Sequence, residues 1–176
     1  MNRTKLWPCL SINLKNWQLP AKSVRGGRRS WGIEEQKLCS NFFLLLLPEV
    51  DAIVSAEAKG IPLVHEVSRL LGMNYFVARK SIKPYMENPI TVEVESITTQ
   101  KKQLLCLNGI DAQKIKGKRV ALIDDVISTG SSIAALEKLV EKAGGIVAAK
   151  AAILAEGDAV NRTDIIYLEE LPLFTD

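Results

Sequence analysis

The segment of residues 120–132, with the sequence VALIDDVISTGSS, limits the fold of this 176-residue chain more than any other. Its four leading apolar residues are typical of a buried strand, which we expect over residues 119–124. Two adjacent acids, Asp124 and Asp125, end that strand, and a loop of small and hydroxyl residues follows. Residues 131–143 then have the periodicity of an amphipathic helix. A strand that passes through a short loop into a helix is typical of parallel α/β sheets.

Other segments predict further strands and helices of the same fold. Alternation of strands and helices indicates an α/β domain with a central, mainly parallel sheet flanked by helices, a Rossmann-like core. The expected strands are 51–56, 74–79, 119–124, 146–155 and 164–168, and the expected helices are 61–71 and 131–143. Residues 90–95 and 103–107 predict an antiparallel hairpin, and the prolines in 80–89 predict a loop before it.

The composition changes abruptly near residue 46. Residues 1–40 contain eight Lys and Arg against two Glu, and all three Trp lie there too. Residues 1–46 show neither helical nor strand periodicity, so we expect an atypical basic segment over 1–46 and a folded domain over 47–176. A basic segment with aromatic residues suits nucleic acid, but a solvated or poorly ordered arm is the simpler interpretation, and we expect no nucleic-acid partner.

Several classes of protein are disfavoured by the composition. The longest apolar run, residues 42–47, is too short to span a bilayer, and no signal peptide is recognisable, so we expect no membrane association. Three cysteines at irregular spacing favour neither a disulfide framework nor a zinc site. A reducing, cytoplasmic location is therefore expected.

The loop after the acidic pair has the donors that a phosphate monoester requires. The start of a helix offers unpaired N–H groups and a positive dipole, and Gly130 allows a close approach of the backbone. Carboxylates accept hydrogen bonds, so Asp124 and Asp125 suit the vicinal hydroxyls of a ribose. Two other interpretations of the acidic pair are weaker. A Walker B strand of a nucleotide hydrolase would need a G-x-x-x-x-G-K-[ST] loop, which is absent from the sequence, and capping of the next helix would explain only one of the two acids.

This segment resembles the signature of type I phosphoribosyltransferases, which bind 5-phosphoribosyl-1-pyrophosphate (PRPP). The resemblance spans roughly residues 48–174. Residues 55–62, SAEAKGIP, resemble the pyrophosphate loop of that family, and residues 77–83, VARKSIK, resemble the strand and start of its mobile loop. Residues 76–80, FVARK, are similar to the corresponding residues of adenine and xanthine phosphoribosyltransferases.

The resemblance implies that PRPP transfers its phosphoribose to a base and releases pyrophosphate. It implies catalytic roles for Asp124, Asp125 and Lys80. The implied PRPP-binding residues are Asp124, Asp125, Ser128, Thr129, Gly130, Ser131 and Ser132. The implied pyrophosphate-binding residues are Ala58, Lys59, Gly60, Arg79, Lys80 and Lys83, with a cis peptide expected between Ala58 and Lys59. Mg²⁺ is expected to bind through PRPP and water without a direct protein ligand, and a homodimer is expected.

The acceptor base is the least determined part of the resemblance. Purine is favoured, with adenine first and xanthine or another 6-oxopurine next, and Glu156 is the candidate base contact, ahead of Asp158. Residues 1–46 do not resemble the hood that covers the base in this family, and a shifted upstream reading frame would explain the difference, as would simple divergence. A non-catalytic, PRPP-binding purine regulator is the alternative, and a pyrimidine acceptor is a third possibility. We assign no catalytic role to His65, Cys106 or Tyr85.

Overall fold

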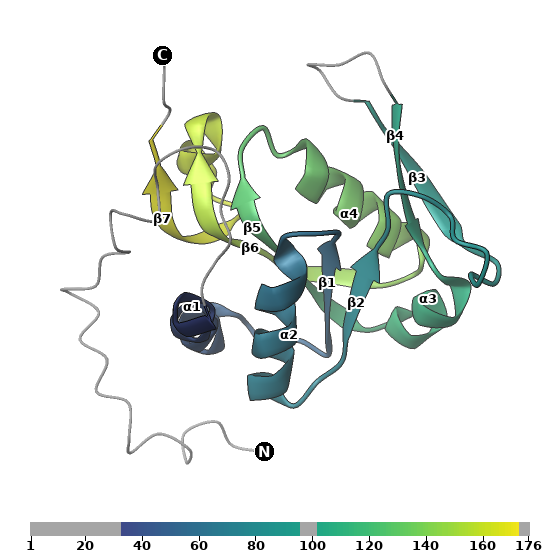
Figure 1. The fold of residues 1–176 in the computed structure, drawn as a ribbon, viewed down its shortest axis with the longest axis horizontal. Helices are drawn as coiled ribbons and strands as arrows, with labels where there is room; N and C mark the ends of the chain where they lie inside the picture. The colour runs from purple at the N-terminus through teal and green to yellow at the C-terminus, as the bar shows by residue number, and fades with distance from the viewer. Residues whose placement is uncertain (1–32, 96–101, 173–176) are drawn as a thin grey trace. The chain divides into compact units, whose positions relative to one another are not determined.

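A computed structural model describes residues 33–95 and 102–172 of the chain. Every described residue belongs to one compact unit, residues 31–176. This unit is the α/β domain drawn in Figure 1.

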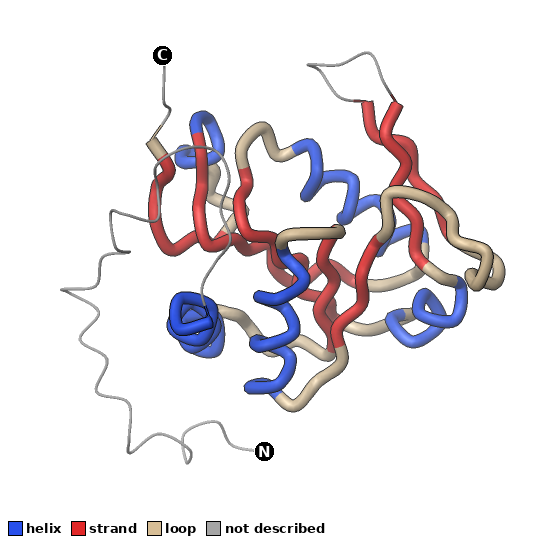
Figure 2. The backbone as a smooth tube through the Cα atoms, in the orientation of Figure 1, coloured by secondary structure: helices blue, strands red, loops and turns tan. Residues whose placement is uncertain are grey.

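The domain is built on a five-stranded sheet in the order β2-β1-β5-β6-β7. All neighbouring strands in it are parallel. The strands are β1 (Ala52–Ala56), β2 (Tyr75–Ala78), β5 (Arg119–Ile127), β6 (Ile146–Glu156) and β7 (Ile166–Leu171). Figure 2 shows these strands flanked by helices, which confirms the predicted α/β class.

Two amphipathic helices cover opposite faces of this sheet. Helix α2 (Gly60–Leu71) joins β1 to β2 in one direction, and α4 (Ser131–Lys142) joins β5 to β6 in the other. Because such crossovers are right-handed, the two helices lie on different faces. Core residues agree with this arrangement: Val54 and Leu122 pack in one buried cluster with α4, whereas Ile53, also fully buried, lies outside that cluster.

The structure contains the antiparallel hairpin that the sequence predicts, and this hairpin packs against α4. It consists of β3 (Ile90–Glu95) and β4 (Lys102–Leu107), with Ile90 opposite Leu107. Lys142 at the end of α4 donates a hydrogen bond of 2.9 Å to the carbonyl of Thr91. Two short helices, α3 (Gly109–Ile115) and the 3-10 helix η4 (Gly157–Asn161), were not predicted.

Helix α1 (Ile33–Leu46) is the main difference between the sequence analysis and the structure. We predicted no periodic structure before residue 47, but Phe42 and Phe43 are buried, and α1 packs against α2. The unbroken apolar run of residues 42–47 conceals the helical period, because polar and apolar positions do not alternate there. Residues 33–46 therefore pack with the domain that we expected to begin at residue 47. Within residues 33–95 and 102–172, no helix has the length and apolar character required to cross a membrane.

Candidate active site

The order in which strands are added to the sheet reverses between β1 and β5. After β1 the chain adds β2 on one side, whereas after β5 it adds β6 and β7 on the other side. In open α/β sheets, ligands bind at such a reversal, outside the carboxyl ends of the strands. The ladder between β1 and β5 ends at Val54 and Leu122, while β5 stays paired with β6 as far as Ile127. The residues after Leu122 therefore lie at the edge where a ligand is expected.

The acidic pair lies at this edge but not at the end of its strand. We predicted that β5 ends at Asp124, but it continues to Ile127 because pairing with β6 extends that far. Both acids are half-buried, and the Asp124 carboxylate accepts a hydrogen bond of 2.9 Å from the backbone N–H of Asp125. Burial, followed by the negative charge of Asp125, raises the pKa of Asp124 from 3.8 to about 7, while the charge of Lys80 opposes this shift.

The loop between β5 and α4 has the geometry expected of a phosphate cradle. Gly130 precedes α4 with a φ of 78°, a left-handed conformation that glycine adopts without strain. Thr129 and Ser131 place their hydroxyl oxygens 3.0 Å apart beside it. The first turn of α4 contains no acid, and the N–H of Ser131 donates a long hydrogen bond of 3.4 Å to Oγ1 of Thr129. Apart from this bond, no side chain of the described residues caps the start of α4, so the other N–H groups of its first turn are available to an anion.

The predicted pyrophosphate loop lies directly against the acidic pair. Ala58 and Lys59 are exposed, whereas Gly60 is buried at the start of α2. A Cβ atom on Gly60 would meet the side-chain oxygen of Ser55, and it would lie 2.9 Å from Oδ1 of Asp124. Only glycine therefore allows this loop to approach the acid so closely.

The cis peptide is found one bond earlier than predicted. It joins Glu57 to Ala58, not Ala58 to Lys59. The resemblance correctly predicted a cis bond in this loop but placed it at the wrong peptide, and the sequence contains no local mark of the bond itself.

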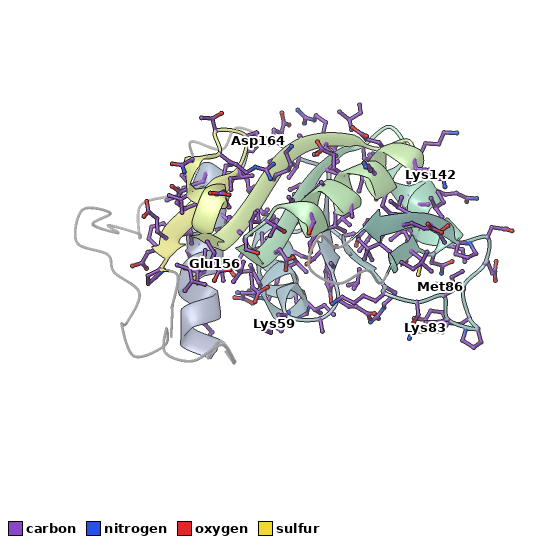
Figure 3. All side chains as sticks on the ribbon, turned by 90° about the horizontal axis from the view of Figure 1, so that it is seen from above. Lys59, Lys83, Met86, Lys142, Glu156 and Asp164 are labelled. Atoms are coloured by element: carbon purple, nitrogen blue, oxygen red, sulfur yellow. The ribbon has the colours of Figure 1, made fainter. Side chains whose placement is uncertain are left out.

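Glu57 connects the pyrophosphate loop to the predicted mobile loop, and sequence reasoning missed it. Its carboxylate accepts hydrogen bonds of 2.7 Å from the backbone N–H of Lys80 and 3.2 Å from Nη1 of Arg79. The N–H of Lys80, the largest cause, and the Arg79 side chain lower the pKa of Glu57. The segment after β2 therefore lies against the pyrophosphate loop. Lys80 is exposed, and Lys83, labelled in Figure 3, is half-buried. No sequence motif would have revealed this contact, because the residues are 22 and 23 positions apart.

Comparison with known proteins identifies the fold family. The profile of the phosphoribosyl transferase domain matches residues 44–167, which is more than half of the chain. The chain belongs to the phosphoribosyltransferase family. The matched region includes the acidic pair, the phosphate loop and the pyrophosphate loop.

Named phosphoribosyltransferases resemble this chain in sequence and in structure. Hypoxanthine/guanine phosphoribosyltransferase of Methanococcus voltae is 36% identical over 113 residues, which cover 64% of this chain and 57% of that protein. The protein of the same name from Methanococcus maripaludis strain C5 is 39% identical over 113 residues, with 64% and 57% covered. The chain thus spans little more than half the length of these relatives.

The solved structures that resemble this phosphoribosyltransferase domain include adenine phosphoribosyltransferases. The enzyme from Thermoanaerobacter pseudethanolicus superimposes with a TM-score of 0.68 at 26% identity, covering 78% of this chain and 81% of that one. The enzyme from Rhodothermus marinus gives a TM-score of 0.68 at 21% identity, covering 80% and 81%, and supports the fold alone.

Glu156 lies at the end of β6, next to β5 in the sheet. It is half-buried, whereas Asp158 in η4 is exposed, and contact of either residue with a base stays a prediction.

The three residues to which we assigned no catalytic role lie on different elements. Cys106 is fully buried on β4 and Tyr85 is 64% exposed, while His65 is exposed on α2 with its ring edge-on to Tyr75.

Proposed function

We propose that this chain transfers phosphoribose from PRPP to a purine base and releases pyrophosphate. One observation carries the proposal: the acidic pair, the phosphate loop and the pyrophosphate loop meet between β1 and β5, where the strand order reverses, with Gly60 against Asp124. The names of the curated relatives and of the solved structures support a purine as the acceptor.

The ribose 5-phosphate is held at two ends. Asp124 and Asp125 accept hydrogen bonds from the ribose hydroxyls, and the amides after Thr129 bind the phosphate. This anchoring fixes C1 of the ribose in line between the leaving pyrophosphate and the attacking base nitrogen. The bond from C1 to the pyrophosphate oxygen breaks with its electron pair on oxygen, and the new bond forms from the base nitrogen to C1, after which the base nitrogen loses its proton.

The pyrophosphate is bound by cations and backbone amides on the β1 and β2 side. Lys59, Lys80 and Arg79 supply positive charge there, and Glu57 fixes the start of the loop that carries the last two. The carboxylates of Asp124 and Asp125 are oxygen acceptors of the kind that orient water bound to Mg²⁺, so these residues fit a magnesium–PRPP complex. Bound Mg²⁺ would supply charge neutralisation of the leaving group.

Adenine and the 6-oxopurines are both consistent with the comparisons. The curated relatives are hypoxanthine/guanine enzymes, while the similar solved structures are adenine enzymes. We keep adenine as the first candidate, with hypoxanthine, guanine and xanthine next, and Glu156 as the proposed base contact. A homodimer remains part of the proposal and is tested by light scattering.

A panel of bases tests the proposed function. Purified protein is incubated with PRPP, Mg²⁺ and each of adenine, hypoxanthine, guanine, xanthine and orotate, and released pyrophosphate is measured. Release with one or more purines is the expected result. Binding of PRPP without turnover on any base would instead favour a PRPP-binding regulator, and turnover on orotate alone would exclude the purine assignment.

A further inference from the structure

The phosphate loop lacks a formal positive charge of its own. Residues 128–132, STGSS, contain neither Lys nor Arg. A phosphate monoester carries about −1.5 to −2 charges at neutral pH, and the partial positive charges of amides and hydroxyls neutralise it only in part. A cation from elsewhere in the fold would strengthen binding, because charge-assisted hydrogen bonds are roughly twice as strong as neutral ones.

Arg162 reaches this loop from the connection between η4 and β7. Its Nη1 atom is the nearest neighbour of the position that a Cβ on Gly130 would occupy. The other two nitrogens are engaged elsewhere: Nε and Nη2 donate hydrogen bonds of 2.9 and 2.7 Å to the two carboxylate oxygens of Asp164. Nη1 donates no hydrogen bond within residues 33–95 and 102–172, so it is the part of the guanidinium directed at the loop.

An ion-pair network fixes Arg162 in this orientation. Asp164 also contacts Lys150 at 2.8 Å, and Lys150 contacts Glu137 of α4 at 3.1 Å. The hydrogen bond from Arg162, followed by that from Lys150, lowers the pKa of Asp164, so its carboxylate stays ionised at neutral pH. A bidentate pair restricts the guanidinium more than a single contact would. Figure 3 shows Asp164 on the side of the domain opposite Lys59, so the network approaches the site from a direction that the pyrophosphate loop does not use.

We propose that Arg162 recognises the 5-phosphate of the bound ribose, with its Nη1 supplying positive charge beside Gly130. The inference rests on the proposed function, since it requires a phosphate in the loop. Asp164 and Lys150 are then positioning residues, which hold the guanidinium but do not touch the ligand.

Calorimetry on the full chain with ribose 5-phosphate, PRPP–Mg²⁺ and pyrophosphate tests this assignment. Arg162→Gln should weaken ribose 5-phosphate and PRPP on the order of tenfold to a hundredfold and leave pyrophosphate binding unchanged. Arg69→Gln is a matched control, because Arg69 makes the same bidentate contact with Glu66, at 2.8 and 2.7 Å, on an exposed part of α2. The control should retain all three affinities.

A second measurement separates charge from structural support. The phosphorus resonance of bound ribose 5-phosphate is titrated in the wild type, in Arg162→Gln and in Arg162→Lys. Free phosphate monoesters titrate near a pKa of about 6. A guanidinium at the phosphate lowers the bound value, so both variants should raise it relative to wild type. The lysine variant raises it less.

The outcomes distinguish this inference from the proposed function. Equal binding of ribose 5-phosphate by wild type and Arg162→Gln, or an unchanged phosphate pKa, would overturn the role of Arg162 and leave the proposed function in place. Should Arg162→Gln fail to fold, Arg162→Met, which also removes the charge, decides alone, and a wild-type phosphate pKa in that variant would overturn the role. Failure of the wild type to bind either sugar phosphate would overturn both.

Discussion

Replacement of Asp124 by Asn should make the stability of this protein less dependent on pH. Asp124 is the acid most strongly affected by burial in the site, with its pKa raised from 3.8 to about 7. An acid whose pKa is higher in the folded state than in the unfolded state binds its proton more tightly when folded. Its contribution to stability is therefore present at pH values below about 4 and is lost as the pH rises through 7.

The magnitude follows from the size of the pKa shift. Each pKa unit corresponds to about 1.4 kcal/mol, so the interval of about two units between pH 5 and pH 7 amounts to about 2–3 kcal/mol. The free energy of unfolding of the wild type should fall by that amount between pH 5 and pH 8, relative to Asp124→Asn. Asparagine keeps an oxygen that accepts the N–H of Asp125, so the local hydrogen bond is retained.

Urea denaturation at pH 5, 6, 7 and 8 measures this difference. Asp158→Asn serves as the control. Asp158 is exposed, so the same chemical change there should give a free energy of unfolding with the same pH dependence as in the wild type. Parallel stability curves for wild type and Asp124→Asn would refute the reasoning, since they would show that burial does not penalise the Asp124 carboxylate. If Asp124→Asn is more stable than the wild type at pH 8 but no longer binds PRPP, the Asp124 carboxylate serves ligand binding and lowers the stability of the fold.

Three further predictions test other parts of the domain. Gly60→Ala should lower stability by about 1–3 kcal/mol and weaken PRPP binding, because its Cβ meets Ser55 and Asp124; unchanged calorimetric and melting data would contradict the contact. Lys59→Gln should weaken pyrophosphate binding about tenfold with ribose 5-phosphate affinity retained, and equal loss of both ligands would argue against a pyrophosphate-specific role. Phe43→Ala should cost about 3–5 kcal/mol in urea denaturation, and a cost near zero would show that α1 does not contribute to the core.

The fold was predictable from the sequence where hydrophobic periodicity is clear. Strand and helix patterns from residue 51 onward gave the parallel sheet, the hairpin and both covering helices, because each element buries a single apolar face or is buried on both sides. Helix α1 was missed because its last turns are apolar on every side. The extension of β5 to Ile127 was missed because the length of a strand depends on its partner, here β6, and a single sequence does not show the pairing.

The candidate site was predictable only in part. The acidic pair and the phosphate loop are contiguous in sequence, so their chemistry could be inferred directly. Glu57 and Arg162 act through contacts between distant segments, and neither belongs to a motif that marks a role for its side chain. The cis bond was predicted one peptide too late along the chain.

The central claim is that the turn from β5 into α4 binds the sugar phosphate, with the acids on the ribose hydroxyls. Calorimetric titration of PRPP–Mg²⁺ into wild type and the double variant Asp124→Asn/Asp125→Asn tests it most directly. We predict a loss of affinity of about a hundredfold or more in the double variant, whose folding is verified by circular dichroism. An unchanged affinity in a folded double variant would contradict the account.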